Sequence, residues 1–272
     1  MSRFEKFNLD NKVALITGAG GLLGRQHAFA IAEAGGVPIL SDIKETTDLA
    51  KEISDKFKVK SIGIVSDITD EKSITELKEQ LIIDFNQADI LINNASINPS
   101  VEDGKLSKGQ LKYFLLEQWN KEIAVGLTGA FICSKIIGEE MAQNHGGVIV
   151  NISSDLGLIA PDQRIYNEED VNNLDKQYKP ITYSVIKHGI IGMTKYLSTY
   201  WLKRNMRVNA LCPGGVHNNQ PEAFISKVED LIPLGRLASI DEYRSAIQFL
   251  CSDASSYMNG SCLIMDGGRS TW

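Results

Sequence analysis

The chain has 272 residues, of which 43% are hydrophobic and 23% charged, with a formal net charge of -6 and an isoelectric point of about 5.3. This balance is ordinary for a globular protein with a large core, and the lack of a basic tail or a lysine- and arginine-rich run argues against nucleic acid as a partner. Four widely spaced cysteines without a CxxC pair predict neither a disulfide framework nor a metal site. The N-terminus has no apolar signal region, and no stretch approaches the ~18 apolar residues of a membrane span, so we expect a cytoplasmic protein without a membrane partner.

Short apolar runs alternate with longer helical patterns along the chain. Strands are predicted at 13–17, 37–40, 61–65, 90–92, 148–152, 207–211 and 262–265. Amphipathic helices are predicted near 22–34, 46–57, 71–85, 110–143, 181–203 and 240–251. Such alternation predicts an α/β fold, a doubly wound parallel sheet of about seven strands with helices on both faces, in a single domain over 1–272.

A glycine-rich turn, TGAGGLLG at 17–24, directly follows the first strand and opens a helix. Glycines there allow a tight turn close to a pyrophosphate, and the helix N-terminus offers free N–H groups to its oxygens. The strand before, the helix after and an acid at the end of the next strand together predict a Rossmann-type dinucleotide site. The turn residues expected to bind the cofactor are Gly18, Gly20, Gly21, Leu23 and Gly24.

Asp42 is the acid at the end of the second strand. A carboxylate at this point can accept hydrogen bonds from both ribose hydroxyls of NAD and would repel the 2′-phosphate of NADP. Residues 19–23 and 43 include no arginine or lysine, although Lys44 is nearby. The sequence therefore predicts NAD rather than NADP, with an exposed turn aspartate as the alternative.

Tyr183 and Lys187 lie four residues apart on one face of a predicted helix. A phenol with a pKa near ~10 is a poor acid or base at neutral pH, and a neighbouring ammonium favours the phenolate. A lone YxxxK pair is common, so a surface helix pair is the alternative.

The order and spacing of further motifs make the pair more specific. They are the glycine turn, Asn93-Asn94-Ala95, Asn151-Ile152-Ser153-Ser154, Pro213-Gly214, Pro233-Leu234-Gly235-Arg236 and Asp266-Gly267-Gly268. Over residues 10–268 the chain resembles the classical short-chain dehydrogenase/reductase family. The resemblance implies an enzyme that moves a hydride between a nicotinamide cofactor and a secondary alcohol or ketone, and a homo-tetramer or homo-dimer.

The resemblance also implies roles for particular residues. Ser154 would hydrogen-bond the substrate oxygen, Tyr183 would give or take its proton, and Lys187 would lower the pKa of Tyr183 and hold the nicotinamide ribose. Asp67 would meet the adenine amino group, and Val216 the carboxamide. The remaining cofactor positions implied are Ile68, Asn94, Ala95, Pro213, Gly214 and Asn218.

Four positions depart from the family pattern. Leu22 replaces a glycine of the turn, Ser96 ends the motif after Asn94-Ala95, and Asn218 stands for a threonine. Gly126 replaces a helix asparagine that anchors a proton-relay water in the family, so another group fills that role or the relay differs. A catalytically silent nucleotide-binding regulator stays open as an alternative.

An insert at 158–180 lengthens the stretch between Ser154 and Tyr183. Its polar composition predicts little packing of its own, so we expect it on the substrate side of the site, with Arg164 in direct contact. His217 is a second candidate for substrate contact. The insert, the GLTG variant at 126–129 and the glycine turn resemble family members of bacterial surface-sugar and flagellin-modification pathways. A sugar or sugar derivative is therefore the leading substrate, with a 3-oxoacyl or other ketone as the alternative.

Overall fold

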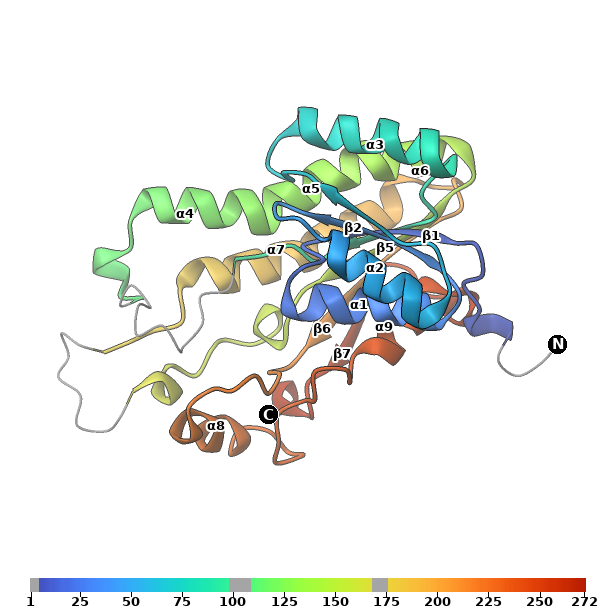
Figure 1. Cartoon of the computed structure of the whole chain (residues 1–272). Coiled ribbons are helices and arrows are strands. Elements are labelled where there is room, and N and C mark those ends of the chain that lie inside the picture. The colour runs from blue at the N-terminus through green and yellow to red at the C-terminus, as the bar shows by residue number, and fades with distance from the viewer. Residues whose placement is uncertain (1–4, 98–108, 168–175) are drawn as a thin grey trace.

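The computed structural model describes residues 5–97, 109–167 and 176–272. Within these residues, seven parallel strands form one sheet in the order β3-β2-β1-β4-β5-β6-β7. Figure 1 shows this sheet between helices such as α3 on one side and α1 on the other. The strands are β1 (Val13–Thr17), β2 (Val37–Asp42), β3 (Ile62–Val65), β4 (Ile90–Asn93), β5 (Gly147–Ile152), β6 (Met206–Pro213) and β7 (Cys262–Met265). The chain proceeds outward from β1 to β3 and returns beside β1 as β4, which creates a switch point where such folds bind ligands.

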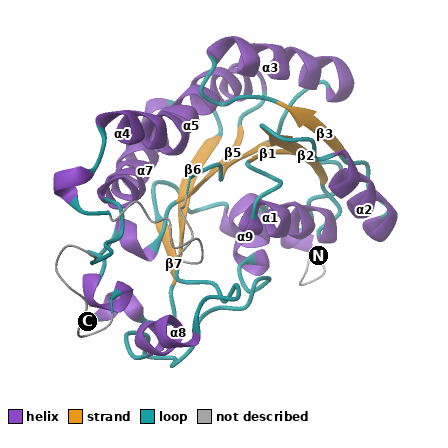
Figure 2. Ribbon diagram, turned by 60° about the vertical axis from the view of Figure 1, so that its left-hand side comes forward, coloured by secondary structure: helices purple, strands orange, loops and turns teal. Residues whose placement is uncertain are grey.

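Helices cover both faces of the sheet, with α1, α2 and α9 on one side and α3, α4, α5 and α7 on the other (Figure 2). The helices are α1 (Leu22–Glu33), α2 (Thr47–Phe57), α3 (Glu71–Phe85), α4 (Leu116–Ile123), α5 (Gly129–Cys133), α6 (Glu139–Asn144), α7 (Ile181–Tyr200), α8 (Glu222–Glu229) and α9 (Arg244–Cys251). The doubly wound α/β fold predicted from the sequence is confirmed.

The apolar strands belong to two core layers. Ala14 and Ile16 of β1 pack into the layer with residues of α1 and α9, whereas Val13 and Leu15 pack into the layer with residues of α3 and α6. Successive side chains of a strand point to opposite faces, so a strand covered on both faces must be apolar throughout. This burial explains why β1 has no polar position before Thr17.

The helix predicted over 110–143 is divided. After a short 3-10 turn at Leu111–Tyr113, α4, α5 and α6 are joined by π-helical segments at Ala124–Thr128 and Ser134–Gly138. Helix α8 was not predicted, because its eight residues lie between turn-rich segments. Within the described residues, no helix is long and apolar enough to span a membrane.

The described part of the insert packs against α8, contrary to the expectation of little packing. Ile165 is buried in a small apolar cluster with Val228 of α8, and the ring of Tyr166 lies 5.7 Å from that of Phe224. The two described ends of the insert, 158–167 and 176–180, are called its stems. They are held together by two hydrogen bonds: the Gln177 N–H donates to Asn167 Oδ1 at 2.6 Å, and Asn167 Nδ2 donates to the Gln177 carbonyl at 2.8 Å. The middle of the insert, 168–175, lies outside the described residues.

Candidate active site

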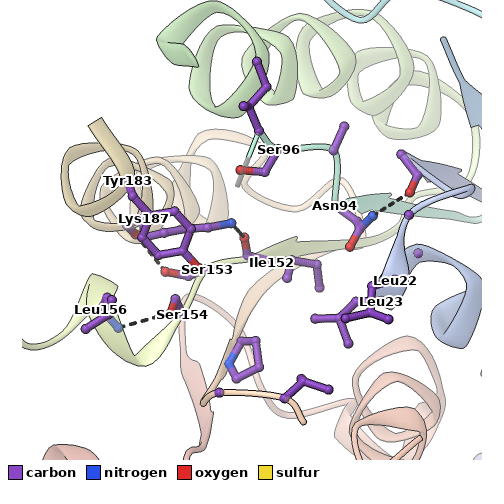
Figure 3. A pocket seen from close by; sticks show the side chains of 18 of the residues that line it. Leu22, Leu23, Asn94, Ser96, Ile152, Ser153, Ser154, Leu156, Tyr183 and Lys187 are labelled. Carbon is purple, nitrogen blue, oxygen red and sulfur yellow. Dashed lines mark hydrogen bonds between the residues drawn. The ribbon is translucent and has the colours of Figure 1, made fainter. Parts of the chain in front are cut away.

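A cavity of about 800 Å³ opens at the carboxyl edge of the sheet. Figure 3 shows Tyr183, Lys187 and Ser154 on one side of it and Leu22, Leu23 and Asn94 on the other. Sixteen of the residues expected to be catalytic or to bind the cofactor line it: Gly18, Gly21, Leu23, Gly24, Asp42, Asp67, Ile68, Asn94, Ala95, Ser154, Tyr183, Lys187, Pro213, Gly214, Val216 and Asn218. Gly20 does not line the cavity, because its N–H is turned to Asp42.

The glycine turn fits a dinucleotide pyrophosphate. Gly18 has a φ of +63°, and a Cβ there would lie 2.7 Å from the Ala95 Cα, while a Cβ on Gly24 would meet the Gly18 carbonyl oxygen. Gly21, the N-cap of α1, has no side chain to cap the helix, so the first N–H groups of α1 stay available for an anion. Asn94 fixes the turn by donating from Nδ2 to the carbonyls of Thr17 at 2.9 Å and Gly18 at 3.0 Å.

Asp42 is held at the end of β2 by backbone donors. Its Oδ2 accepts from the Gly20 N–H at 3.0 Å, and its Oδ1 accepts from the Lys44 N–H at 3.1 Å. The carboxylate therefore has a fixed place at the cavity wall, next to the glycine turn. Lys44 itself is not among the lining residues.

Ser154 lies two residues after the end of β5 and caps a 3-10 turn at Asp155–Gly157. Its hydroxyl donates to Asp155 Oδ1 at 2.7 Å and accepts from the Leu156 N–H at 3.2 Å. Asp155 is buried, and its Oδ2 lies 3.1 Å from Nε of Arg269. Burial raises the pKa of the Asp155 carboxyl, while the hydrogen bond from Ser154 and the charge of Arg269 act in the opposite direction.

Tyr183 and Lys187 project from the first turns of α7. Lys187 Nζ donates to the Ile152 carbonyl at 2.9 Å and lies 5.6 Å from the centre of the Tyr183 ring. Burial raises the pKa of Tyr183 to about 12, against a hydrogen bond with Ser154 that lowers it, and burial lowers the pKa of Lys187 to about 8. Burial is the largest influence on the pKa of Tyr183, and the lowering of that pKa by Lys187 stays a prediction.

Gly126 lies in the π-helical segment that faces α7. A Cβ there would lie 2.8 Å from the Ile186 Cγ2, so Ile186 occupies the space that an asparagine would need. From the same stretch of helix, Lys121 and Val125 reach the cavity wall. The structure therefore replaces the asparagine of the family pattern with tight apolar packing.

Comparison with known proteins agrees with this geometry. A family model described as short chain dehydrogenase matches residues 12–167, and one described as enoyl-(acyl carrier protein) reductase matches residues 172–270. The chain belongs to the short-chain dehydrogenase/reductase family. It is accordingly an oxidoreductase that acts on CH–OH groups of small molecules with a nicotinamide cofactor, which sets aside the silent regulator.

Three relatives illustrate the range of substrates in this family. The chain is 32% identical over 272 residues to an NAD-dependent glycerol dehydrogenase of Listeria innocua, with 97% of this chain and 96% of the relative covered. It is 32% identical over 269 residues to a 3-oxoacyl-[acyl-carrier-protein] reductase of Aquifex aeolicus, covering 97% and 99%. A crystal structure of a gluconate 5-dehydrogenase from Burkholderia cenocepacia in complex with NADP and tartrate shares 26% identity, with a TM-score of 0.86 and 99% of both chains covered.

Two candidate substrate contacts lie away from the cavity of this short-chain dehydrogenase. The Arg164 side chain is 87% exposed and forms an ion pair with Asp162 at 2.6 Å, which turns it outward. His217 is also exposed and does not line the cavity. The sequence indicates the chemistry of these two side chains but not their direction, which depends on the residues packed around each loop.

Other side chains reach the cavity in their place. Tyr166 and Lys179 come from the insert, Phe224 from α8, and Arg269 from the turn after β7. Lys179 lies within the insert, but nothing in the sequence separates it from the other polar residues there. Arg269 directly follows the motif Asp266-Gly267-Gly268, and this position after a family motif is the one feature of the sequence that could have pointed to it as a cavity residue.

Proposed function

We propose that this short-chain dehydrogenase uses NAD to interconvert a secondary alcohol and a ketone on a sugar-derived substrate, with Ser154, Tyr183 and Lys187 as the reacting and orienting groups. The main support is that Ser154 and Tyr183 lie in the same cavity as the glycine turn and Asp42. A substrate oxygen placed between the two hydroxyls lies near the cofactor site.

The proton chemistry follows from the positions of these side chains. The Tyr183 hydroxyl exchanges a proton with the substrate oxygen, and Ser154 holds that oxygen in place. Lys187 is anchored on the Ile152 carbonyl at 2.9 Å and stabilises negative charge as it develops on the phenol. When bound, the nicotinamide supplies or accepts the hydride.

Asp42 supports NAD as the preferred cofactor. Its carboxylate, fixed by Gly20 and Lys44, would repel a 2′-phosphate, and the lining cations Lys121, Lys179, Lys187 and Arg269 come from other parts of the cavity. The glycerol dehydrogenase relative is named NAD-dependent, whereas the gluconate dehydrogenase structure contains NADP.

Cofactor titration tests this preference. We expect NAD to bind at least about tenfold more tightly than NADP, since one charge clash of about 1.4 kcal/mol corresponds to that ratio. Asp42→Asn keeps a side-chain oxygen for the backbone donors but removes the charge, so it should reduce the ratio about tenfold. Asp48→Asn, an exposed acid of α2 outside the cavity lining, is the matched control and should leave the ratio unchanged. Equal affinity of the unsubstituted chain for both cofactors would reject the preference.

A 3-oxoacyl reductase is the second candidate, supported by the Aquifex aeolicus relative. Turnover of the holoenzyme with sugars, sugar acids, nucleotide sugars and a 3-oxoacyl thioester separates the two. The nucleotide sugars also test the resemblance to surface-sugar enzymes, which stays a prediction.

A further inference from the structure

Arg269 brings a buried cation to the catalytic end of the cavity. The residue is 7% exposed, and the turn that carries it is fixed by Asp266, which accepts from the N–H groups of Gly268 at 2.9 Å and Ser270 at 2.8 Å. Its Nε pairs with Asp155, but among the described residues no group accepts a hydrogen bond from the buried Nη1. A guanidinium stays protonated, and a buried donor without an acceptor is unfavourable, so this nitrogen is suited to an oxygen of a ligand.

Lys179 brings a second cation to the same end from the returning stem of the insert. Its Nζ lies 4.0 Å from the centre of the Tyr183 ring, and its backbone N–H donates to Gln163 Oε1 at 2.9 Å, which fixes the stem. Asp155 interacts electrostatically with both Lys179 and Arg269. The two cations therefore lie around the hydroxyls at which the substrate oxygen would bind.

Positive charge exceeds negative charge among the described side chains that line this end. Asp155 is the one lining carboxylate there, against the cations Lys121, Lys179, Lys187 and Arg269. Two more acids lie close by: Glu122, which accepts from Thr182 and Gln118, adds a second negative charge, whereas Asp162 is paired with Arg164, so the cations still outnumber the acids. An anionic group on the substrate would balance this excess.

We propose that the substrate is a hydroxy acid whose carboxylate binds between Arg269 Nη1 and Lys179 Nζ, an inference that rests on the dehydrogenase function proposed above. One guanidinium nitrogen and one ammonium provide a donor for each oxygen of a carboxylate. A phosphate fits this pair of donors less well, because it has three terminal oxygens and because its larger negative charge would be repelled by the Asp155 carboxylate beside Arg269. The reacting hydroxyl then lies on a carbon within reach of Ser154 and Tyr183.

Calorimetry with matched ligand pairs tests the subsite. The NAD-saturated Tyr183→Phe chain keeps the ring beneath Lys179 and is expected to turn over at least about hundredfold more slowly, so binding is measured with little reaction heat. D-Gluconate is compared with D-glucitol, and L-tartrate with L-threitol, because the members of each pair differ in their carboxylates. We expect each acid to bind at least about tenfold more tightly than its alcohol.

Substitutions assign that preference to the two cations. Lys179→Met and Arg269→Lys should each weaken acid binding about tenfold and leave alcohol binding unchanged. If Arg269→Lys does not fold, Lys179→Met decides alone. Arg164→Gln, an arginine of the same insert that is exposed and paired with Asp162, is the control and should change neither.

Three results would overturn the subsite: equal affinity within both pairs, an acid preference that survives both substitutions, or D-glucose 6-phosphate binding more tightly than D-gluconate with the same dependence on Lys179. The proposed function fails separately. If none of the alcohols tested lets the Tyr183-containing chain reduce NAD, but the acid preference in binding persists, the dehydrogenase function is rejected and the subsite is kept. If the chain oxidises polyols and shows no acid preference, the subsite is rejected and the function is kept.

Discussion

At the residue scale, the chemistry depends on a phenol and an ammonium that are both buried. Burial disfavours the charged form of each group, which raises the pKa of Tyr183 to about 12 and lowers that of Lys187 to about 8, so Lys187 is still a cation at neutral pH. Tyr183 is thus protonated at neutral pH, ready to donate to a ketone. In the oxidation direction it must first lose that proton, and the nearby cations Lys187 and Lys179 favour the phenolate.

Replacing Tyr183 by phenylalanine separates proton transfer from cofactor binding. We expect Tyr183→Phe to lower kcat at least about hundredfold, the usual contribution of a positioned acid or base. The NAD dissociation constant should change little, because the glycine turn is distant in sequence and the ring that packs beneath Lys179 at 4.0 Å is retained. Steady-state kinetics and fluorescence titration measure the two effects, and normal turnover in the variant would assign the proton transfer to another group.

At the scale of the elements, the long helix around Gly126 packs too closely on α7 to admit a side chain. A Cβ on Gly126 would lie 2.8 Å from the Ile186 Cγ2, so Gly126→Asn should lower the free energy of unfolding by about 1–3 kcal/mol. Ile186→Val should recover part of that loss in the double variant. Urea denaturation provides the measurement, and a fully stable Gly126→Asn chain would contradict the steric explanation.

The insert is the second element on which the substrate side depends. Ile165, Tyr166 and Lys179 line the cavity from it, and α8 supports it from outside through Phe224. We propose that the chain is one continuous domain over 1–272 and that the described ends of the insert, 158–167 and 176–180, contribute to the substrate-side wall of its cavity. The wall is held by apolar packing as well as by polar stems, which a reading of its polar composition alone did not suggest.

For the whole molecule, the sequence predicted what depends on local pattern. The strands were recognisable because burial on both faces makes them apolar. The cofactor side of the cavity was recognisable because the glycine turn and Asp42 are short motifs at the ends of β1 and β2. The substrate half depends on side chains far apart in the chain, such as Asp155 with Arg269, which no local pattern connects. The charge of Arg164 suggested a contact with the substrate, but its guanidinium is paired instead with Asp162, two residues away.

The outer surface of α5 and α7 is the candidate contact between copies of the chain. Among the apolar residues of α5 and α7, Ile132 and Ile190 are buried in the core. Phe131 on α5 is 50% exposed and Tyr196 on α7 is 64% exposed, which leaves apolar surface for a second copy.

We expect light scattering at micromolar concentration to give two or four times the chain mass of 30.0 kDa. Phe131→Glu combined with Tyr196→Glu should place unpaired charge in a buried contact and shift the mass toward the monomer. Ile83→Glu, at a position on α3 that is 81% exposed, is the control and should leave the mass unchanged, because a single exposed side chain away from the contact face adds little. A monomeric unsubstituted chain, or an oligomer unaffected by the double substitution, would show that α5 and α7 do not form the contact.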